Sequence, residues 1–203
     1  NKRILLRGII DHLRTACTVF QQRDGNLSYA PVTGHSGDLT MTGLSNYTLD
    51  EITIGQTASY SKQVEARDIQ LFAAVSGDVN PVHLDADFAA NTQFKRCIAH
   101  GMLSGAIISA AIAMKLPGPG TIYLNQSMRF RHPVYPGDTV TVHLEVKEIN
   151  ARRGFITLDC RVLNQDQKAV VTGTAEVKAP TEKILLERPA LPHVTVEASV
   201  DPA

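Results

Sequence analysis

The chain is predicted to be an α+β protein in which one long buried helix is wrapped by a curved antiparallel sheet. Two observations support this. Residues 100–116 are apolar on most sides of a helix, and such a helix belongs in a core. From residue 121 onwards the apolar period switches to two, through four segments separated by turn residues. A meander with one apolar face can cover the helix, so the two patterns together indicate a single α+β core.

Composition and charge exclude several classes of protein. The hydrophobic share of 43% is ordinary for a globular chain, and the formal net charge is zero, so neither nucleic acid nor a membrane is expected as a partner. The longest apolar run, about 107–116, is too short to span a bilayer. Cys17, Cys97 and Cys160 are far apart and form no C-x-x-C pair, which favours free thiols in a reducing cytoplasm over a disulfide framework or a zinc site.

Three regions are expected along the chain. Residues 1–45 combine an amphipathic start with a Gly/Ser/Thr-rich loop, which indicates an N-terminal extension or leader. Basic residues in that start would suit a transit peptide, but Asp11 and Asp24 count against one. Residues 46–178 carry the periodic core, and the Pro-containing residues 179–203 are expected to be a tail or linker.

Short elements are expected before the long helix. An extended lead-in covers 47–64, and a short helix over 67–75 should place Ile69, Phe72 and Ala73 on one face. The segment 77–81 breaks that helix, because proline lacks an N–H and clashes with a preceding turn. Asp85 is a candidate N-cap for a second short helix that ends at Ala90.

The long helix and the meander are predicted residue by residue. One ridge of the helix holds only small residues, at i, i+4 spacing, and a backbone or a ligand could approach it closely. Pro117-Gly118-Pro119-Gly120 ends the helix. The small ridge is Gly101, Gly105, Ser109 and Ala113, the second helix face is Leu103, Ile107, Ala110 and Met114, and the inward strand positions are Ile122, Leu124, Met128, Phe130, Val140, Val142, Leu144, Val146, Ile156, Leu158, Cys160, Val162, Val171, Ala175 and Val177.

The segment Ser76-Gly77-Asp78-Val79-Asn80-Pro81-Val82-His83 places an acid, an amide and an imidazole around a proline turn. Such a turn can aim Asp78 and His83 at one point, where a carboxylate and an imidazole would act on one water as general acid and base. Asn80 has the amide needed to hold a carboxylate or a substrate group. Equally, Asp78 and Asn80 are common turn formers, and a single histidine such as His83 is often structural.

The start of the long helix offers a second kind of chemistry. Its first backbone N–H groups are unpaired and lie at the positive end of the helix dipole, which suits a carbonyl oxygen that gains negative charge. Gly101 has no side chain to keep that oxygen away, and Ser109 lies two turns further along the same ridge. His100 is expected to cap or brace the helix start. Arg129 and Arg131 are expected on a solvated strand face rather than on a phosphate.

The segment Ser76-Gly77-Asp78-Val79-Asn80-Pro81-Val82-His83 resembles the signature of the MaoC-like, R-specific enoyl-CoA hydratases. Ala99-His100-Gly101-Met102 and Gly120-Thr121-Ile122-Tyr123-Leu124 resemble the same family in order and spacing, and the resemblance covers about residues 47–178. It implies a hot-dog fold, normally dimerised into one continuous sheet. It further implies reversible syn hydration of a trans-2-enoyl-CoA to an (R)-3-hydroxyacyl-CoA, with no metal or cofactor beyond the coenzyme A of the substrate.

The resemblance also assigns roles to residues. Asp78 and His83 match the pair that activates water, Gly101 matches the glycine that contacts the thioester carbonyl, Asn80 matches the motif amide, and Ser109 matches a pocket serine. Some relatives fuse this domain to a phosphate acyltransferase, and residues 179–203 could be the start of such a linker.

Two other functions remain open from the sequence. A hot-dog acyl-CoA thioesterase would use a similar cavity, although such enzymes generally lack the Asp-x-Asn-Pro-x-His turn. A non-catalytic acyl-CoA-binding domain would tolerate the loss of Asp78 or His83, and both are present.

Overall fold

The computed structural model describes residues 43–196. The leader or extension expected for residues 1–45 falls almost entirely outside this range, as do Cys17 and the last residues of the expected tail. The described elements begin with β1 (Gly43–Ser45) and end with β7 (Leu185–Glu187). None of the helices in the described range is long and apolar enough to cross a membrane.

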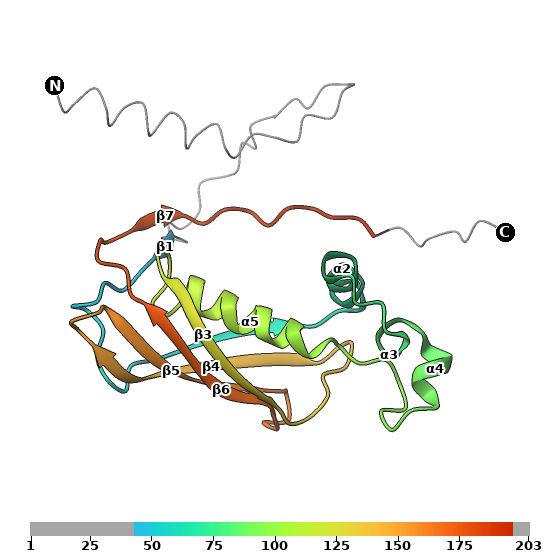
Figure 1. Ribbon diagram of the computed structural model, residues 1–203. Helices are drawn as coiled ribbons and strands as arrows, with labels where there is room; N and C mark the ends of the chain where they lie inside the picture. Colours follow the sequence, from blue (N-terminus) through green and yellow to red (C-terminus); the bar gives the residue numbers. More distant parts are fainter. Residues whose placement is uncertain (1–42, 197–203) are drawn as a thin grey trace, which may run out of the picture. The chain divides into compact units, whose positions relative to one another are not determined.

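Five strands form one antiparallel sheet in the order β2-β4-β5-β6-β3. They are β2 (Thr57–Gln63), β3 (Ile122–Phe130), β4 (Thr139–Asn150), β5 (Phe155–Leu163) and β6 (Ala169–Lys178). Helix α5 (Gly101–Met114) lies along one face of the curved sheet, as Figure 1 shows. The predicted α+β architecture, a long helix wrapped by an antiparallel meander, is confirmed, and it is the hot-dog arrangement.

The shorter helices precede α5. They are α2 (Ala66–Ser76), α3 (Pro81–Leu84) and α4 (Ala86–Ala90). Helix α2 ends where Gly77 adopts a left-handed φ of 76°, which costs a glycine little. The predicted cap on α4 is present, because the Phe88 N–H donates to Asp85 Oδ1 at 2.9 Å. Helix α3 was not expected: Pro81 stands in its first turn, where its missing N–H costs nothing.

The core lies between α5 and the central strands. The inward positions predicted for β4 and β5 are all buried, as are Val171, Ala175 and Val177 on β6. Helix α5 meets them with Leu103, Ile107, Ile108, Ala111 and Ile112. The predicted second helix face is therefore only half right. Leu103 and Ile107 are buried, but Ala110 and Met114 are only partly covered because the helix is rotated toward Ile108 and Ile112.

Strand β3 departs from the predicted burial pattern. Ile122, Leu124 and Phe130 were expected to face inward, yet all three are exposed, whereas Met128 is half-buried. The reason is position: β3 is an edge strand of the sheet, and a register shift between Tyr123 and Asn125 interrupts its pairing with β6. The chain therefore exposes apolar side chains on an edge strand of its sheet.

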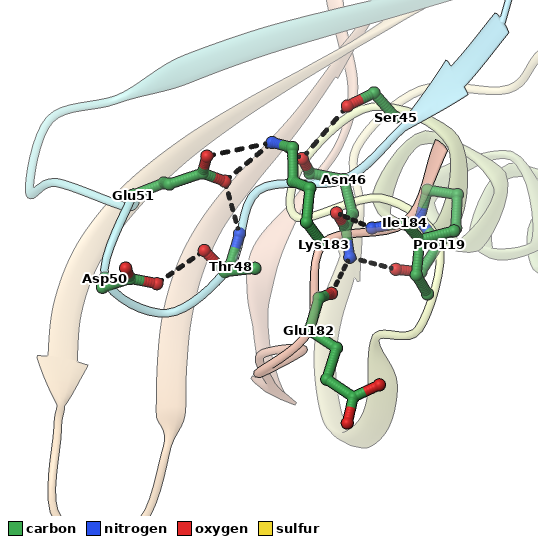
Figure 2. Close-up of polar contacts among 9 residues, drawn as sticks. All are labelled: Ser45, Asn46, Thr48, Asp50, Glu51, Pro119, Glu182, Lys183 and Ile184. Carbon is green, nitrogen blue, oxygen red and sulfur yellow. Dashed lines mark hydrogen bonds and ion pairs between the residues drawn. The ribbon is translucent and has the colours of Figure 1, made fainter. Parts of the chain in front are cut away.

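The segment expected to be only a tail or linker contains ordered structure. Strand β7 pairs antiparallel with β1, and Asn46, which is buried, fixes this arrangement. Its amide donates to the carbonyl oxygens of Pro119 and Glu182 at 3.1 and 2.9 Å and accepts from the Ile184 N–H at 2.9 Å (Figure 2). Strands of three residues are too short to show a periodicity, so this long-range pairing had no signal in the sequence.

Candidate active site

The loop between α2 and α3 holds two of the predicted site residues, Asp78 and Asn80. Asn80 caps α3, because its Oδ1 accepts from the Val82 N–H at 3.2 Å. The Asn80 N–H in turn donates to Asp78 Oδ1 at 3.2 Å. These short-range bonds are the turn-forming kind that both side chains favour. Asn80 thus shapes the loop that presents Asp78, and both residues are exposed.

His83 projects from α3 and is half-buried. Its Nδ1 lies 2.8 Å from the carbonyl oxygen of Ile98. A carbonyl oxygen only accepts, so the proton of a neutral ring must be on Nδ1 and the lone pair on Nε2. The local structure therefore prepares His83 to act as a base through Nε2.

Asp78, His83 and His100 come together as a cluster. One carboxylate oxygen of Asp78 and one ring nitrogen from each histidine lie within 4.8 Å of one another. A water that makes two bonds of about 2.8 Å at a tetrahedral angle bridges atoms roughly 4.6 Å apart, so a water fits between the carboxylate and an imidazole. A metal ion fits less well. The two rings are stacked on each other, and His83 Nδ1 and His100 Nε2 are already engaged by backbone carbonyl oxygens, so each ring has only one nitrogen left for an ion.

His100 sits immediately before α5 and is only 2% exposed. Its side chain makes no capping bond to the helix. Instead its Nε2 lies 2.9 Å from the backbone carbonyl oxygen of Asp78, and its ring stacks on that of His83 with centroids 3.8 Å apart. The Phe72 ring of α2 also packs on the His100 ring, with the two centroids 5.1 Å apart. Of the two roles expected for His100, bracing describes the contacts and capping does not.

Gly101 is the first residue of α5, so its N–H has no partner within the helix and lies at the positive end of the dipole. The Phe130 ring of β3 lies close to the backbone at this position. A Cβ built on Gly101 would lie 3.0 Å from the Phe130 ring of β3. The absent side chain therefore keeps the space beside this N–H open.

Two cavities flank the helix start, and His100, Gly101 and Phe130 line both. One, of about 340 Å³, also contacts Asp78 and Phe72. The other, of about 270 Å³, runs past His83 and Ser104 toward Val134 and Val171. Asp78 lines the first cavity, His83 lines the second and Gly101 lines both, so the start of α5 borders the cavities of both predicted acid–base residues.

A larger cavity, of about 520 Å³, lies elsewhere on the sheet. It is lined by outward-facing groups of β2, β4 and β5, including His143, Glu145 and Arg161. Arg161 is engaged in ion pairs with Asp159 and Glu145. This surface is a solvated, charge-paired face of the sheet, so its greater volume does not make it the better candidate for the site.

The structure separates the predicted site residues into two sets. Asp78, His83 and Gly101 share one region, with Asn80 beside them in the loop. Ser109 is exposed on α5 and lines neither cavity beside the helix start. Eight residues of helix put it about 12 Å from Gly101, too far to contact the same carbonyl. Arg129 and Arg131 are exposed as expected, although Arg131 also lines the 270 Å³ cavity.

Sequence reasoning did not single out Ser104 and Phe130 for the site. Ser104 is 3% exposed and lines the smaller cavity one turn after His100. Its spacing from His100 was the available signal, but the ridge of small residues that begins at Gly101 pointed to Ser109 instead. Phe130 looked like an inward strand residue, and only the pairing of β3 at the sheet edge brings it to Gly101.

Comparison with known proteins agrees with this fold and shows the family. The sequence model of the MaoC like domain family matches residues 50–167. The (R)-specific enoyl-CoA hydratase of Aeromonas caviae is 44% identical over 129 residues, which are 64% of this chain and 96% of that protein. The protein of the same name from Rhodospirillum rubrum is 45% identical over 133 residues, covering 64% of this chain and 90% of the relative.

A solved structure shows the same fold. The R-hydratase PhaJ1 from Pseudomonas aeruginosa, in its unliganded form, superposes with a TM-score of 0.73 at 54% identity, over 76% of this chain and 99% of its own. The fold defines a hot-dog protein, and its candidate site places Asp78 and His83 beside the residue at which α5 begins. The chain belongs to the MaoC-like domain family.

Proposed function

We propose that this protein is an (R)-specific enoyl-CoA hydratase, a hydro-lyase that adds water reversibly to trans-2-enoyl-CoA and forms (R)-3-hydroxyacyl-CoA. The observation that carries the proposal is the placement of Asp78 and His83 within 4.8 Å of each other, beside the first N–H of α5. The similarity to proteins named (R)-specific enoyl-CoA hydratases supports both the reaction and its stereochemistry.

The geometry suggests how each group contributes. Asp78 accepts a hydrogen bond from the water and orients it, while His83 Nε2 takes the other proton as the water oxygen bonds to C3. The electrons of the C2=C3 bond move toward the thioester oxygen, where the Gly101 N–H stabilises the enolate. The proton held by His83 then passes to C2 on the same face. One water is consumed, the addition is syn, and His83 returns to its starting state.

This scheme uses no metal and no cofactor, since coenzyme A is part of the substrate. Asn80 holds the loop that carries Asp78, and its exposed amide also makes it a proposed substrate-binding residue. Ser109 is proposed to contact the acyl group far from the reacting carbons, because it lies about 12 Å along α5 from Gly101. Residues 46–178 are the proposed catalytic domain. Cys97 and Cys160 are free thiols, in keeping with the proposed cytoplasmic location.

A homodimer is part of the proposal. Strand β3 is an open edge with Ile122, Tyr123 and Leu124 exposed, and an apolar edge strand is a ready template for pairing with a second chain. We expect a dimer by light scattering after gel filtration, and we expect Leu124→Lys to shift the mass toward that of one chain. A wild-type chain that runs as a monomer at micromolar concentration would contradict this part of the proposal.

The reaction is tested with crotonyl-CoA. The wild type should remove the absorbance of the conjugated double bond without releasing free thiol. Asp78→Asn and His83→Ala should each lower kcat about 10²–10⁴-fold. Asp166→Asn, in an exposed turn, and His143→Ala, on the solvated sheet face, are matched controls that should keep the wild-type rate. Release of coenzyme A thiol would show a thioesterase instead. Full activity in both site variants would overturn the assignment of the pair.

A further inference from the structure

We infer that His100 is a positioning residue that fixes the geometry between the acid–base pair and the carbonyl-binding N–H, an inference that rests on the proposed hydration. His100 contacts both members of the pair. Its Nε2 lies 2.9 Å from the Asp78 carbonyl oxygen, and its ring stacks on His83 at 3.8 Å. It is also the residue directly before Gly101 in the chain. One side chain thus ties the two halves of the site together.

The bond to Asp78 spans 22 residues of sequence. Other bonds in the Asp78 loop are short-range: Asp78 N–H to Ser76 Oγ, and Asn80 N–H to Asp78 Oδ1. These local bonds shape the loop but do not determine how far it lies from α5. The His100 contact joins the backbone at Asp78 itself to the start of α5, whereas the His83 Nδ1–Ile98 O and Ile98 N–H–Val82 O bonds tie only α3 to the segment before α5. A misplacement of about 1 Å between reacting groups can cost about 100-fold in rate, so this distance matters for catalysis.

The two stacked imidazoles are held in opposite tautomers by backbone carbonyls. Asp78 O only accepts, so Nε2 of His100 carries the proton and Nδ1 keeps the lone pair. Ile98 O likewise places the proton of His83 on Nδ1 and leaves Nε2 free. Consequently His83 offers its basic nitrogen to the water, while His100 is committed to Asp78 through its N–H.

A histidine at position 100 is unfavourable for stability alone, because one of its buried ring nitrogens has no hydrogen-bond partner in the described part of the chain. Within residues 43–196, its Nδ1 is the buried side-chain polar atom that has no hydrogen-bond partner. Buried polar groups are normally satisfied, and an apolar ring would pack against Phe72 without this cost. Proteins tolerate such unfavourable groups at functional sites, where the geometry of the reacting residues matters more than stability. The position of His100 beside Asp78 and His83 fits that pattern.

The test compares His100→Phe, which keeps a flat ring but removes the donor, with His100→Gln, whose amide nitrogen can replace Nε2–H. His143→Phe, on the exposed face of β4, is the matched control. For crotonyl-CoA hydration we expect His100→Phe to lower kcat about 10- to 100-fold, with KM changed less than about threefold and Tm unchanged or raised. His100→Gln should recover much of the lost kcat.

Two results would overturn the inference. One is a His100→Phe variant that keeps kcat within about twofold of the wild type. The other is an equal loss of kcat in both variants that follows a fall in Tm, as a packing role alone requires. Nitrogen NMR of the histidine-labelled wild type provides a check independent of turnover and of variant folding. It should show the Nε2–H tautomer for His100 and the Nδ1–H tautomer for His83, and the reverse would contradict the inference. A wild type that folds but hydrates no enoyl-CoA would refute the proposed function, and the NMR result would still decide the His100 contact.

Discussion

His83 donates a hydrogen bond from Nδ1 to the carbonyl oxygen of Ile98, fifteen residues further along the chain, across 2.8 Å. The contact orients the ring and leaves Nε2 as its basic atom. It therefore separates two properties of His83 that a single substitution can test, the structural bond and the base.

His83→Asn should separate them. The asparagine amide can occupy the place of Nδ1–H and keep the bond to Ile98, but it supplies no base. We expect kcat for crotonyl-CoA hydration to fall about 10²–10⁴-fold while Tm stays close to that of the wild type. His143→Asn, on the solvated face of β4, should leave both quantities unchanged. Activity within a few-fold of the wild type would mean that another group removes the proton.

Gly101→Ala tests the open space at the start of α5. The added methyl would lie 3.0 Å from Phe130, whose half-exposed ring can move aside but then intrudes on the cavities that it lines. We expect kcat/KM to fall about tenfold or more, with a stability change below about 1 kcal/mol because alanine suits a helix. Gly105→Ala, one turn on, meets only the flexible ends of Met128 and Met102 and should cost less. Equal activity for Gly101→Ala and the wild type would argue against a carbonyl held at this N–H.

Asn46→Ala should destabilise the fold far from the site. Its side chain bonds three backbone groups from two other segments, and removing it leaves buried polar groups without partners (Figure 2). Each unsatisfied group costs about 1–3 kcal/mol, so we expect a loss of roughly 2–4 kcal/mol in the free energy of unfolding, measured with urea. Asn91→Ala removes one exposed bond to Asp87 and should cost less than about 1 kcal/mol. Equal effects of the two changes would show that the Asn46 contacts add little.

Lowering the pH should loosen residues 183–187, because protonation of Glu51 removes its ion pair with Lys183. The hydrogen bond and charge of Lys183, with the Thr48 N–H, lower the pKa of Glu51 from its usual value. Since the folded pKa lies below the unfolded one, the stabilisation is complete above the unfolded pKa and is lost as pH falls through the folded pKa. We expect faster hydrogen exchange at residues 183–187 as pH falls below about 4.5, after correction for intrinsic rates. In Glu51→Gln this extra pH dependence should disappear, and its persistence would assign the effect to another group.

The sequence by itself determined much of the fold and the chemistry of the loop. The inward positions of β4 and β5 follow from their period of two, and α5 follows from a segment that is apolar almost all round. Asp78, His83 and Gly101 are predicted as site residues because their residue types and order carry both chemical meaning and a family resemblance. Such information is local, so a pattern along one strand, helix or turn is enough to convey it.

Tertiary structure decided what depends on neighbours that are distant in sequence. Strand β3 has the alternation of an inward-facing strand, but its edge position exposes Ile122 and Leu124 and brings Phe130 to Gly101. The β1–β7 pair is too short to leave a pattern, and the contact of His100 with Asp78 joins residues 22 apart. Burial and hydrogen bonding are properties of pairs of segments. The sequence therefore specifies which groups are available, and only the packing of α5, the loop and the sheet determines which of them meet.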